Sequence, residues 1–467
     1  MDIGQRQLTA DQEEKILILG LGLSGSSAAE LAKKHGAAVT VLDVGGSATL
    51  QDSAELLRHR GIDVCLEWNE KGWNAPVDLV VISPGVHPDS LLGRLGASLS
   101  CPLVGELEFG FRYCSCPILA VTGTNGKTTT VELLVHCLRH AGRKVIAAGN
   151  VGVPLCEAVR RSAALDFLVV EVSSFQLEHI SRFAPLAAAL LNVTPDHLDR
   201  YESFDTYMGA KLQLFKNVSR CCKIVLREDL IECDTVNASL PGDESIPICF
   251  TSRESLFAAF FVAEDGMLCQ RTSTGVLPLL SSAQVRLDGR HNVENVLAAL
   301  ALAQAAGILP SELASHVSTF VPKRHRLELV AINDGVRFVN DSKATNVDSL
   351  SKGLVTSAER SSGKILLIAG GDDKGIDFVS VIALLAKYVK EVFLIGRCRE
   401  RLAKQWGHVV SCKTFVSLAV AVDVAADAAV SGDTVLLSPG CASQDMFVDY
   451  ADRGQQFCEL VKRRIGE

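Results

Sequence analysis

A glycine-rich segment that contains a lysine is the strongest chemical signal in the sequence. It reads Thr122-Gly123-Thr124-Asn125-Gly126-Lys127-Thr128-Thr129 and lies between a short apolar run and a helical pattern. Such a loop can turn backbone N–H groups toward phosphate oxygens, while the lysine contacts the terminal phosphates and the next hydroxyl binds magnesium. The general pattern asks for glycine at position 121, where this chain has Val121. We therefore predict a phosphate loop whose spacing differs from the common ATPase form.

A second glycine-rich turn lies near the N-terminus. Residues Gly20-Leu21-Gly22-Leu23-Ser24-Gly25 follow an apolar run, and Asp43 ends the next run. This arrangement lets the backbone approach a pyrophosphate, and the carboxylate can accept a hydrogen bond from a ribose or a base. NAD, FAD and UDP-sugars all satisfy it, and a tight turn without a ligand is a further alternative. The residues alone leave the ligand of this turn open.

Candidate magnesium ligands lie in the central region. Glu171 ends one apolar run, and His197 follows the next. Magnesium prefers hard oxygen ligands, so Glu171, Thr128 and the nucleotide phosphates would make a first site. His197 is a rarer magnesium ligand, and a hydrogen-bonded core histidine is the alternative. The pattern around Lys211 is typical of a solvated helix lysine.

Polar turns in the last third of the chain supply further cations and hydroxyls. They read Lys323-Arg324-His325-Arg326, Asn340-Asp341-Ser342-Lys343-Ala344-Thr345-Asn346 and Gly370-Gly371-Asp372-Asp373-Lys374. A surface charge cluster is an alternative for the first turn. It explains the second less well, because the aspartate and lysine directly follow an apolar run. Upstream, the segment Gly289–Asn295 opens an alanine-rich helix, whose first amides could bind an adenine edge.

Short apolar runs alternate with longer helical patterns along the whole chain. We expect strands at residues 16–19, 39–42, 79–82, 118–121, 167–172, 188–193, 365–369, 392–395 and 434–437. This alternation is typical of parallel α/β sheets, which bind ligands at the carboxyl ends of their strands. The turn Ser83-Pro84-Gly85 lies at such an end. We predict an α/β protein with three domains, at residues 1–105, 106–322 and 323–467.

Composition narrows the functional classes. The 467 residues include 46 Lys and Arg against 54 Asp and Glu, so the chain lacks the positive surplus typical of nucleic-acid binding. Its 15 cysteines form no CxxC pair, and we expect buried thiols in a reducing cytosol. The first 15 residues lack the pattern of a signal peptide, and the longest apolar stretch is too short for a membrane span. We expect a cytoplasmic monomer without nucleic-acid or membrane partners.

In their order along the chain, these motifs resemble those of the Mur ligases, the ATP-dependent amide-forming enzymes of bacterial peptidoglycan synthesis. The phosphate loop, with Val121 before it, matches the superfamily form. The segments Glu171–Leu177, Asn192–Arg200 and Asn340–Asn346 look like the D-glutamate-adding branch in particular. The resemblance covers nearly the whole length. It implies Rossmann-like sheets in the N-terminal and C-terminal domains and a mostly parallel sheet of the P-loop ATPase type between them.

The resemblance also implies an activity. The chain would use ATP to add D-glutamate to UDP-N-acetylmuramoyl-L-alanine, through an acyl phosphate and a tetrahedral intermediate. It would bind two magnesium ions, one at Thr128 and Glu171 and one at His197 and a carbamylated Lys211. The carbamate would turn that lysine into an oxygen ligand. The catalytic positions would be Lys127, His197, Lys211 and Lys343.

The other matching positions divide between the substrates. ATP would be bound by Gly123, Thr124, Asn125, Gly126, Lys127, Thr128, Thr129, Asn292, Asn295, Arg326 and Asp341. The UDP moiety would be bound by Gly22, Leu23, Ser24, Asp43, Ser83, Pro84 and Gly85. Further substrate-binding positions would be Asn150, Ser173 and His197, with Lys343, Thr345, Lys374, Ser443, Gln444 and Tyr450 around the glutamate and the transferred phosphoryl group. The chain departs from the family at Val44, Asp373, Gln444 and Tyr450, so we expect some uridine and glutamate contacts to differ.

Three alternatives explain less of the sequence. A folylpolyglutamate synthase would share the phosphate loop and Glu171, but the N-terminal glycine turn and Ser173-Ser174-Phe175-Gln176 speak against it. An NAD-dependent oxidoreductase would leave Lys127 without a role. A noncatalytic nucleotide-binding regulator would have broken catalytic positions, whereas the catalytic positions of this chain carry the expected residue types.

Domain closure is a further expectation. Because an acyl phosphate hydrolyses readily, we expect the C-terminal domain to close over the central domain when ATP and substrate bind.

Overall fold

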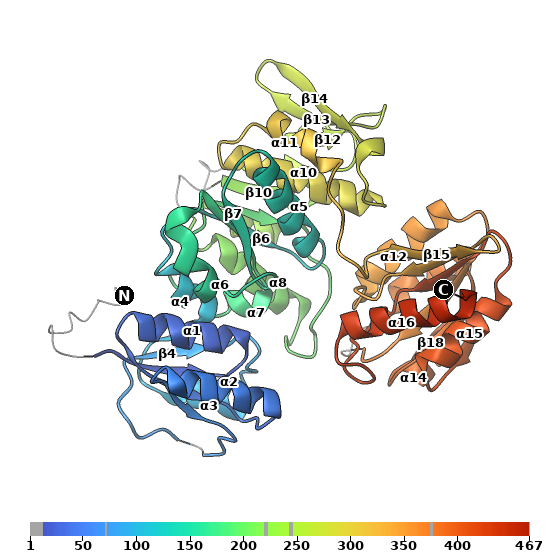
Figure 1. Ribbon diagram of the computed structural model, residues 1–467. Helices are drawn as coiled ribbons and strands as arrows, with labels where there is room; N and C mark the ends of the chain where they lie inside the picture. Colours follow the sequence, from blue (N-terminus) through green and yellow to red (C-terminus); the bar gives the residue numbers. More distant parts are fainter. Residues whose placement is uncertain (1–12, 71, 219–222, 242–245, 374–376, 467) are drawn as a thin grey trace.

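Three sheets follow one another along the chain, each covered by helices. The computed structural model describes residues 13–70, 72–218, 223–241, 246–373 and 377–466. In Figure 1 the central unit, green to yellow, lies between a blue N-terminal unit and an orange to red C-terminal unit. This architecture confirms the prediction of a three-domain α/β protein. Lys374, expected at the glutamate, lies outside the described residues.

The N-terminal sheet is entirely parallel, with strand order β3-β2-β1-β4-β5. Its elements are β1 (Lys15–Leu19), α1 (Leu23–Lys34), β2 (Ala38–Leu42), α2 (Ala48–His59), β3 (Asp63–Cys65), β4 (Leu79–Ile82), α3 (Leu91–Ser98) and β5 (Leu103–Gly105). The strand order reverses between β1 and β4, which is where such sheets bind ligands. Helix α1 approaches β1 so closely that a Cβ on Gly25 would lie 1.8 Å from the Gly20 carbonyl oxygen. Glycine is therefore required at this crossing.

The central sheet has nine strands in the order β14-β13-β12-β11-β10-β9-β6-β8-β7. Strand β13 pairs antiparallel with β12 and with β14, and the other described pairs of this sheet are parallel. Its strands are β6 (Ile118–Thr122), β7 (Val145–Gly149), β8 (Phe167–Glu171), β9 (Ala187–Leu190), β10 (Lys223–Arg227), β11 (Ile248–Phe250), β12 (Phe260–Val262), β13 (Met267–Thr272) and β14 (Gly275–Ser281). Its α-helices are α4 (Glu106–Phe111), α5 (Lys127–His140), α6 (Leu155–Ala158), α7 (Ser174–Leu177), α8 (Phe204–Leu212), α9 (Asp234–Ala238), α10 (Arg290–Ala305) and α11 (Pro310–Val317). Apolar faces of α5 and α10 pack together in one core cluster.

The C-terminal sheet has the strand order β15-β16-β20-β17-β18-β19, and only β15 runs antiparallel to its neighbour. Its strands are β15 (Glu328–Asn333), β16 (Val336–Asn340), β17 (Ile365–Gly370), β18 (Val389–Ile395), β19 (Ser411–Thr414) and β20 (Thr434–Leu437). Its helices are α12 (Val347–Arg360), α13 (Ile382–Tyr388), α14 (Arg399–Trp406), α15 (Leu418–Ala428) and α16 (Tyr450–Ile465). The buried Arg453 donates to the carbonyls of Ser342 and Cys441. It thereby ties together two loops at the carboxyl edge of the sheet.

All nine expected strands are present. The largest differences at one end are three residues: β9 ends at Leu190 rather than at residue 193, and β18 begins at Val389 rather than at residue 392. We propose domain boundaries after residues 105 and 322, because one lies directly after β5 and the other between α11 and β15. No helix in the described part of the chain is long and apolar enough to cross a membrane.

The expectation that the cysteines are buried is wrong in part. Those that the structure describes are free thiols, but Cys65 is exposed and several others are only half-buried. Cys65 ends β3 on the edge of its sheet, where few atoms cover a side chain. In contrast, Cys398 and Cys441 are buried in contact, with their Sγ atoms 3.6 Å apart.

Candidate active site

The phosphate loop joins β6 to α5 and is held rigidly. Gly126 caps α5 with a φ of 86°, and a Cβ there would lie 2.3 Å from Asn295 Oδ1. The Asn192 side chain grips the backbone of Asn125, accepting from its N–H at 2.9 Å and donating to its carbonyl at 3.0 Å. Lys127 Nζ donates to two loop carbonyls, those of Gly123 and Thr124, both at 2.8 Å. The ammonium group is therefore held against the loop that would receive the phosphates.

The loop opens into a cavity of about 300 Å³ between the central and C-terminal domains. Many of the expected site residues line this cavity: Thr124, Asn125, Gly126, Lys127, Thr128, Asn150, Glu171, Ser173, His197, Lys211, Arg326, Lys343 and Thr345. They come from seven separate stretches of sequence. The fold thus gathers residues from both domains around one space.

Glu171 has the surroundings of a metal ligand. Its carboxylate is buried at the end of β8, and Oε1 accepts from Asn150 Nδ2 at 2.6 Å. Within the described residues, Oε2 is buried without a hydrogen-bond partner. A buried carboxylate oxygen is costly unless a cation or a donor satisfies it. With Thr128 lining the same cavity, this donor set fits the oxygen-ligand preference of Mg²⁺.

Lys211 is buried, so the expectation of a solvated helix lysine is wrong. Helix α8 packs its last turn beneath the phosphate loop, leaving Lys211 1% exposed. Its Nζ donates to the Gly123 carbonyl at 2.9 Å and lies 4.5 Å from the centre of the Tyr207 ring. Burial, and then the charge of Lys127, lower the pKa of Lys211 well below its usual value. A neutral amine is the form that reacts with carbon dioxide, so the surroundings fit a carbamate.

His197 is not the core histidine of the alternative interpretation. Its side chain is 32% exposed, and its backbone has a φ of 55°, a left-handed conformation unusual for a residue with a Cβ. The ring packs edge-on against Phe175, with centroids 4.8 Å apart, and Nε2 lies 3.8 Å from Asp196 Oδ2. The turn presents the imidazole to the cavity of Glu171 and Lys211.

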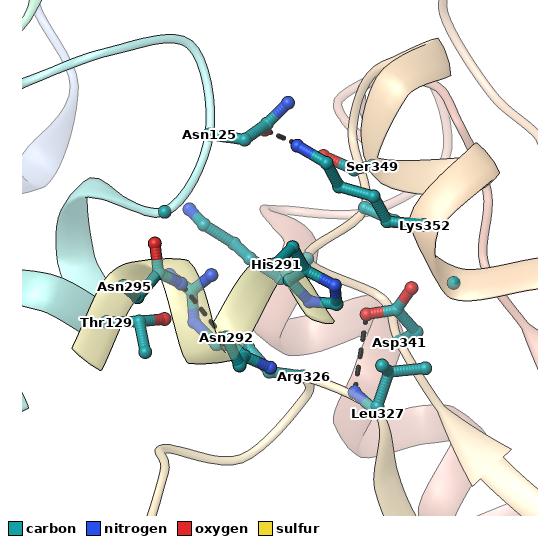
Figure 2. A pocket seen from close by; sticks show the side chains of 14 residues that line it. Asn125, Thr129, His291, Asn292, Asn295, Arg326, Leu327, Asp341, Ser349 and Lys352 are labelled. Atoms are coloured by element: carbon teal, nitrogen blue, oxygen red, sulfur yellow. Dashed lines mark hydrogen bonds between the residues drawn. The ribbon is translucent and has the colours of Figure 1, made fainter. Parts of the chain in front are cut away.

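A smaller cavity of about 80 Å³ adjoins the first (Figure 2). It is lined by expected nucleotide-binding residues: Gly126, Thr129, Asn292, Asn295, Arg326 and Asp341. Asn295 donates to Asn292 at 3.0 Å, and Ser438 donates to Asp341 at 2.8 Å. Burial raises the pKa of Asp341 to about 7. The cavity offers amides, a guanidinium and a carboxyl group, which suits an adenosine moiety.

Two residues at this cavity were missed as site residues in the sequence. His291 opens α10, and burial lowers its pKa to about 4, so the ring is neutral. Lys352 lies on α12, where its Nζ donates to Asp348 at 2.7 Å. His291 stands inside the motif that opens the alanine-rich helix, and Lys352 is spaced four residues from Asp348, as helix pairs are. Neither pattern indicates a nucleotide site in the sequence, because the two residues come to the same cavity only through the packing of the two domains.

The N-terminal glycine turn lies in a separate sheet. Asp43 accepts from the backbone N–H groups of Leu21 at 2.6 Å and Gly45 at 2.7 Å. Ser83 Oγ donates to the Gly20 carbonyl at 3.0 Å and so fastens the turn to the loop after β4. The structure therefore gathers the expected UDP-binding residues at one sheet edge: Gly22, Leu23, Ser24, Asp43, Ser83, Pro84 and Gly85.

The expected glutamate residues are gathered only in part. Lys343 Nζ lies 3.7 Å from the centre of the Tyr450 ring, a cation–π contact. Ser443 is buried and Gln444 is exposed, and neither is among the residues lining the two cavities just described. Of the expected glutamate residues, Lys343 and Tyr450 are therefore in contact with each other, whereas Ser443 and Gln444 line neither cavity.

Family models match three successive parts of the chain. The Mur ligase MurD-like N-terminal domain matches residues 14–92, the Mur ligase middle domain residues 121–303, and the Mur ligase glutamate ligase domain residues 325–441. The UDP-N-acetylmuramoylalanine--D-glutamate ligase of Thermoanaerobacter pseudethanolicus is 37% identical over 452 residues, 96% of this chain and 98% of that protein. The enzyme of the same name from Koribacter versatilis is 38% identical over 452 residues, covering 96% and 97%.

Solved structures share the fold at lower identity. MurF from Acinetobacter baumannii superposes with a TM-score of 0.62 at 15% identity, covering 96% of this chain and 93% of that one. MurF from Thermotoga maritima in complex with ADP gives 0.60 at 15% identity, covering 91% and 95%. Because the family models match in order and the curated relatives align over nearly the full length, this chain belongs to the Mur ligase family.

Proposed function

We propose that this chain joins D-glutamate to UDP-N-acetylmuramoyl-L-alanine at the expense of ATP. The observation that carries the proposal is one cavity lined by the phosphate-loop Lys127, by Glu171 and by Lys343 of the other domain. One oxygen of Glu171 is buried there without a partner among the described residues. The curated relatives named for this reaction support the choice of substrates.

Charge explains why so many cations surround the cavity. A substrate carboxylate must attack the γ-phosphate of ATP, and both partners are anions that repel each other. Lys127 from the central domain and Lys343 from the C-terminal domain would neutralise the phosphates from two sides. Positioning and electrostatics supply most of the catalysis in phosphoryl transfer. The two lysines would therefore orient the attack as well as permit it.

The metal site would be built by central-domain side chains. Glu171 and Thr128 would hold one ion, and His197 and the carbamate of Lys211 a second. Bound magnesium would supply positive charge to the phosphate oxygens. The neutral Lys211 amine would add to carbon dioxide and release one proton, which leaves an anionic oxygen ligand at the end of the side chain. Asn150 would keep the Glu171 carboxylate oriented.

Amide formation, the second step of the reaction, needs no nucleophile from the enzyme, but it needs a cavity from which water is excluded. Transfer gives an acyl phosphate on the substrate, and the amine of D-glutamate attacks its carbonyl carbon. The tetrahedral intermediate then expels phosphate and leaves the amide. Lys343 and Thr345 would face the transferred phosphoryl group, with the glutamate bound on the C-terminal domain. Closure of that domain would exclude water from the acyl phosphate.

The N-terminal turn would bind the uridine diphosphate. Helix α1 directs its N-terminal amides to this edge, and Asp43 keeps the turn in shape. The exposed Leu23, at the first position of α1, would be covered by the bound substrate. Because ATP and UDP-linked sugars are cytoplasmic metabolites, we propose that the enzyme acts in the cytoplasm. We also propose that it acts as a monomer.

Phosphate release tests this function directly. The enzyme is incubated with Mg-ATP and UDP-N-acetylmuramoyl-L-alanine, in parallel with D-glutamate, L-glutamate or no amino acid. We expect release with D-glutamate alone. Release with another amino acid would support the same reaction mechanism with a different amino-acid substrate, and Gln444 and Tyr450 would be the first residues to examine. If no acceptor supports release while ADP still binds, the ligase proposal is wrong and a regulatory role takes its place.

A further inference from the structure

The side chain of Asn125 is occupied by the C-terminal domain although its backbone belongs to the phosphate loop. Its Nδ2 donates to Asp348 Oδ2 at 2.6 Å and to Asn346 Oδ1 at 3.3 Å. Its Oδ1 accepts from Ser349 Oγ at 2.7 Å and from Asn346 Nδ2 at 3.2 Å. A side-chain amide has two donor hydrogens and two acceptor lone pairs, so these contacts use its full capacity. In Figure 2 a dashed line marks the hydrogen bond between Asn125 and Ser349 at the edge of the smaller cavity.

The three partners form the first turn of α12 and are themselves fixed. Asn346 caps the helix by accepting from the Ser349 N–H at 2.9 Å. Asn346 Nδ2 also donates to Asp196 Oδ2 of the central domain at 2.9 Å. Asp348 accepts from Lys352 at 2.7 Å. Asn346, Asp348 and Ser349 thus form a polar site that holds one amide side chain, which we call the socket.

The socket also determines the place of Lys343. Only Ala344 and Thr345 separate this lysine from Asn346, and the short connection leaves little freedom between them. Lys343 and Thr345 both line the cavity that the phosphate loop opens into. Docking of the α12 turn on Asn125 therefore sets the position of Lys343 relative to the loop.

We propose that Asn125 is a positioning residue whose side chain docks α12 on the phosphate loop and so places Lys343 at the transferred phosphoryl group. The role assigned to Lys343 rests on the proposed function. In this account the backbone of Asn125 stays part of the phosphate loop, while its side chain serves the domain interface rather than ATP. Asp348 presents a carboxylate oxygen to the Nδ2 group of Asn125, so an amide can donate to it, whereas a carboxylate of the same shape would be repelled by it.

A charge pair tests the docking. Asn125→Asp brings a carboxylate against that of Asp348, and we expect kcat to fall about 100-fold while the Kd for ADP changes less than about threefold. Adding Asp348→Asn supplies an amide that can donate to the new carboxylate. The double variant should recover at least about tenfold in kcat. In parallel, X-ray scattering of the ADP-bound proteins should give a larger radius of gyration for Asn125→Asp than for the wild type, and the double variant should reverse it.

Arg360→Ala is the matched control. It removes an ion pair to Asp288 at the other end of α12, between the same two domains, but its side chain is 60% exposed. We expect a change in kcat below about twofold, because exposed pairs contribute little. A Kd for ADP that rises about tenfold or more in Asn125→Asp and is not restored by Asp348→Asn would show that the side chain binds nucleotide, and the docking proposal would be wrong.

Unchanged kcat and scattering in Asn125→Asp would overturn the proposal as well. A different result separates it from the proposed function. If the wild type shows no phosphate release with any acceptor, but Asn125→Asp still opens the ADP-bound protein and Asp348→Asn closes it, the docking stands and the assigned reaction is wrong.

Discussion

Two glycine-rich turns of this molecule have the same local form and opposite chemical character. One joins β1 to α1 and the other joins β6 to α5, and each lies at the carboxyl edge of a parallel sheet. In the first, the carboxylate of Asp43 is directed at its own turn and accepts two backbone N–H groups. In the second, Lys127 lies against the loop carbonyls, and Glu171 nearby has an oxygen without a partner among the described residues. The carboxylate at the first turn is satisfied by the turn itself, whereas one carboxylate oxygen beside the second has no partner among the described residues.

Burial separates the two turns further. Leu23, which opens α1, is 82% exposed, whereas Glu171 and Lys211 beside the phosphate loop are 2% and 1% exposed. Electrostatic interactions are stronger where water is excluded. Glycines make the backbone of both turns accessible. The buried charged side chains of Glu171 and Lys211 and the C-terminal domain that covers the phosphate loop belong to the second turn, and we expect group transfer there. The comparison predicts that substitutions at the second turn affect turnover and those at the first affect substrate binding.

The largest effect should come from Lys127→Met. It removes the ammonium group from the phosphate loop, and we expect kcat to fall about 1,000-fold because transition-state charge loses its compensation. The KM for the UDP substrate should change little. Phosphate release under saturating substrates measures both quantities. Lys323→Met is the control, because that lysine is 66% exposed, pairs with Glu132 and does not line either cavity. More than about a tenth of wild-type activity in Lys127→Met would contradict the contrast between the turns.

Glu171→Gln should have the next largest effect. The amide keeps the shape but removes the charge that would hold magnesium, so we expect about a 100-fold loss of kcat at a fixed magnesium concentration. Raising the magnesium concentration should recover part of it, and chelation with EDTA should stop the wild type. A titration of activity against magnesium measures the shift. Identical magnesium curves for the two proteins would remove Glu171 from the metal site.

Glu106→Gln should change stability at the joint between the two sheets. Glu106 opens α4 directly after β5, and burial raises its pKa to about 7. An unfolded glutamate titrates near pH 4.3, so between about pH 4 and 7 the folded protein binds more protons than the unfolded chain. The contribution of Glu106 to stability is therefore complete below about pH 4 and falls as the pH rises to about 7. The glutamine remains neutral throughout.

The expected gain of Glu106→Gln over the wild type is about 3 kcal/mol larger at pH 8 than at pH 4. Urea unfolding at the two pH values measures this difference. The low-pH comparison is its own control, because the wild-type side chain is then neutral like the amide. A gap between the two proteins that stays constant from pH 4 to pH 8 would contradict the raised pKa.

The sequence predicts nine buried strands and the phosphate loop because their signals are local, whereas it does not predict short strands such as β3 and β5. A phosphate loop needs its glycines and lysine within a few adjacent residues, and β6 and α5 flank it with apolar patterns of their own periods. Buried strands likewise identify themselves by short runs of branched apolar side chains. Family resemblance added expected roles for residues far apart in the sequence, such as Lys211 and Lys343.

Burial and domain docking could not be predicted in this way. Lys211 contacts a carbonyl 88 residues away, and the pattern of α8 gives no indication of that contact. The docking of α12 brings Lys352 to His291, although each residue looks like an ordinary helix residue in the sequence. Asn125 belongs to the phosphate-loop motif, yet its side-chain partners lie more than 200 residues further along the chain.

The smallest of the expected effects, at Asp43, is the one that tests the separation of the two turns. Asp43→Asn keeps one acceptor oxygen for the N–H groups of Leu21 and Gly45 and places an NH₂ group against the other, so the turn should loosen. We expect the KM for the UDP substrate to rise about tenfold, with kcat and the KM for ATP changed less than about twofold. Ser83→Ala, which removes one bond to the Gly20 carbonyl, should shift the same KM less. If the KM for ATP rises together with that for the UDP substrate, the two turns do not act separately. If neither KM moves, the N-terminal edge is not where the nucleotide sugar binds.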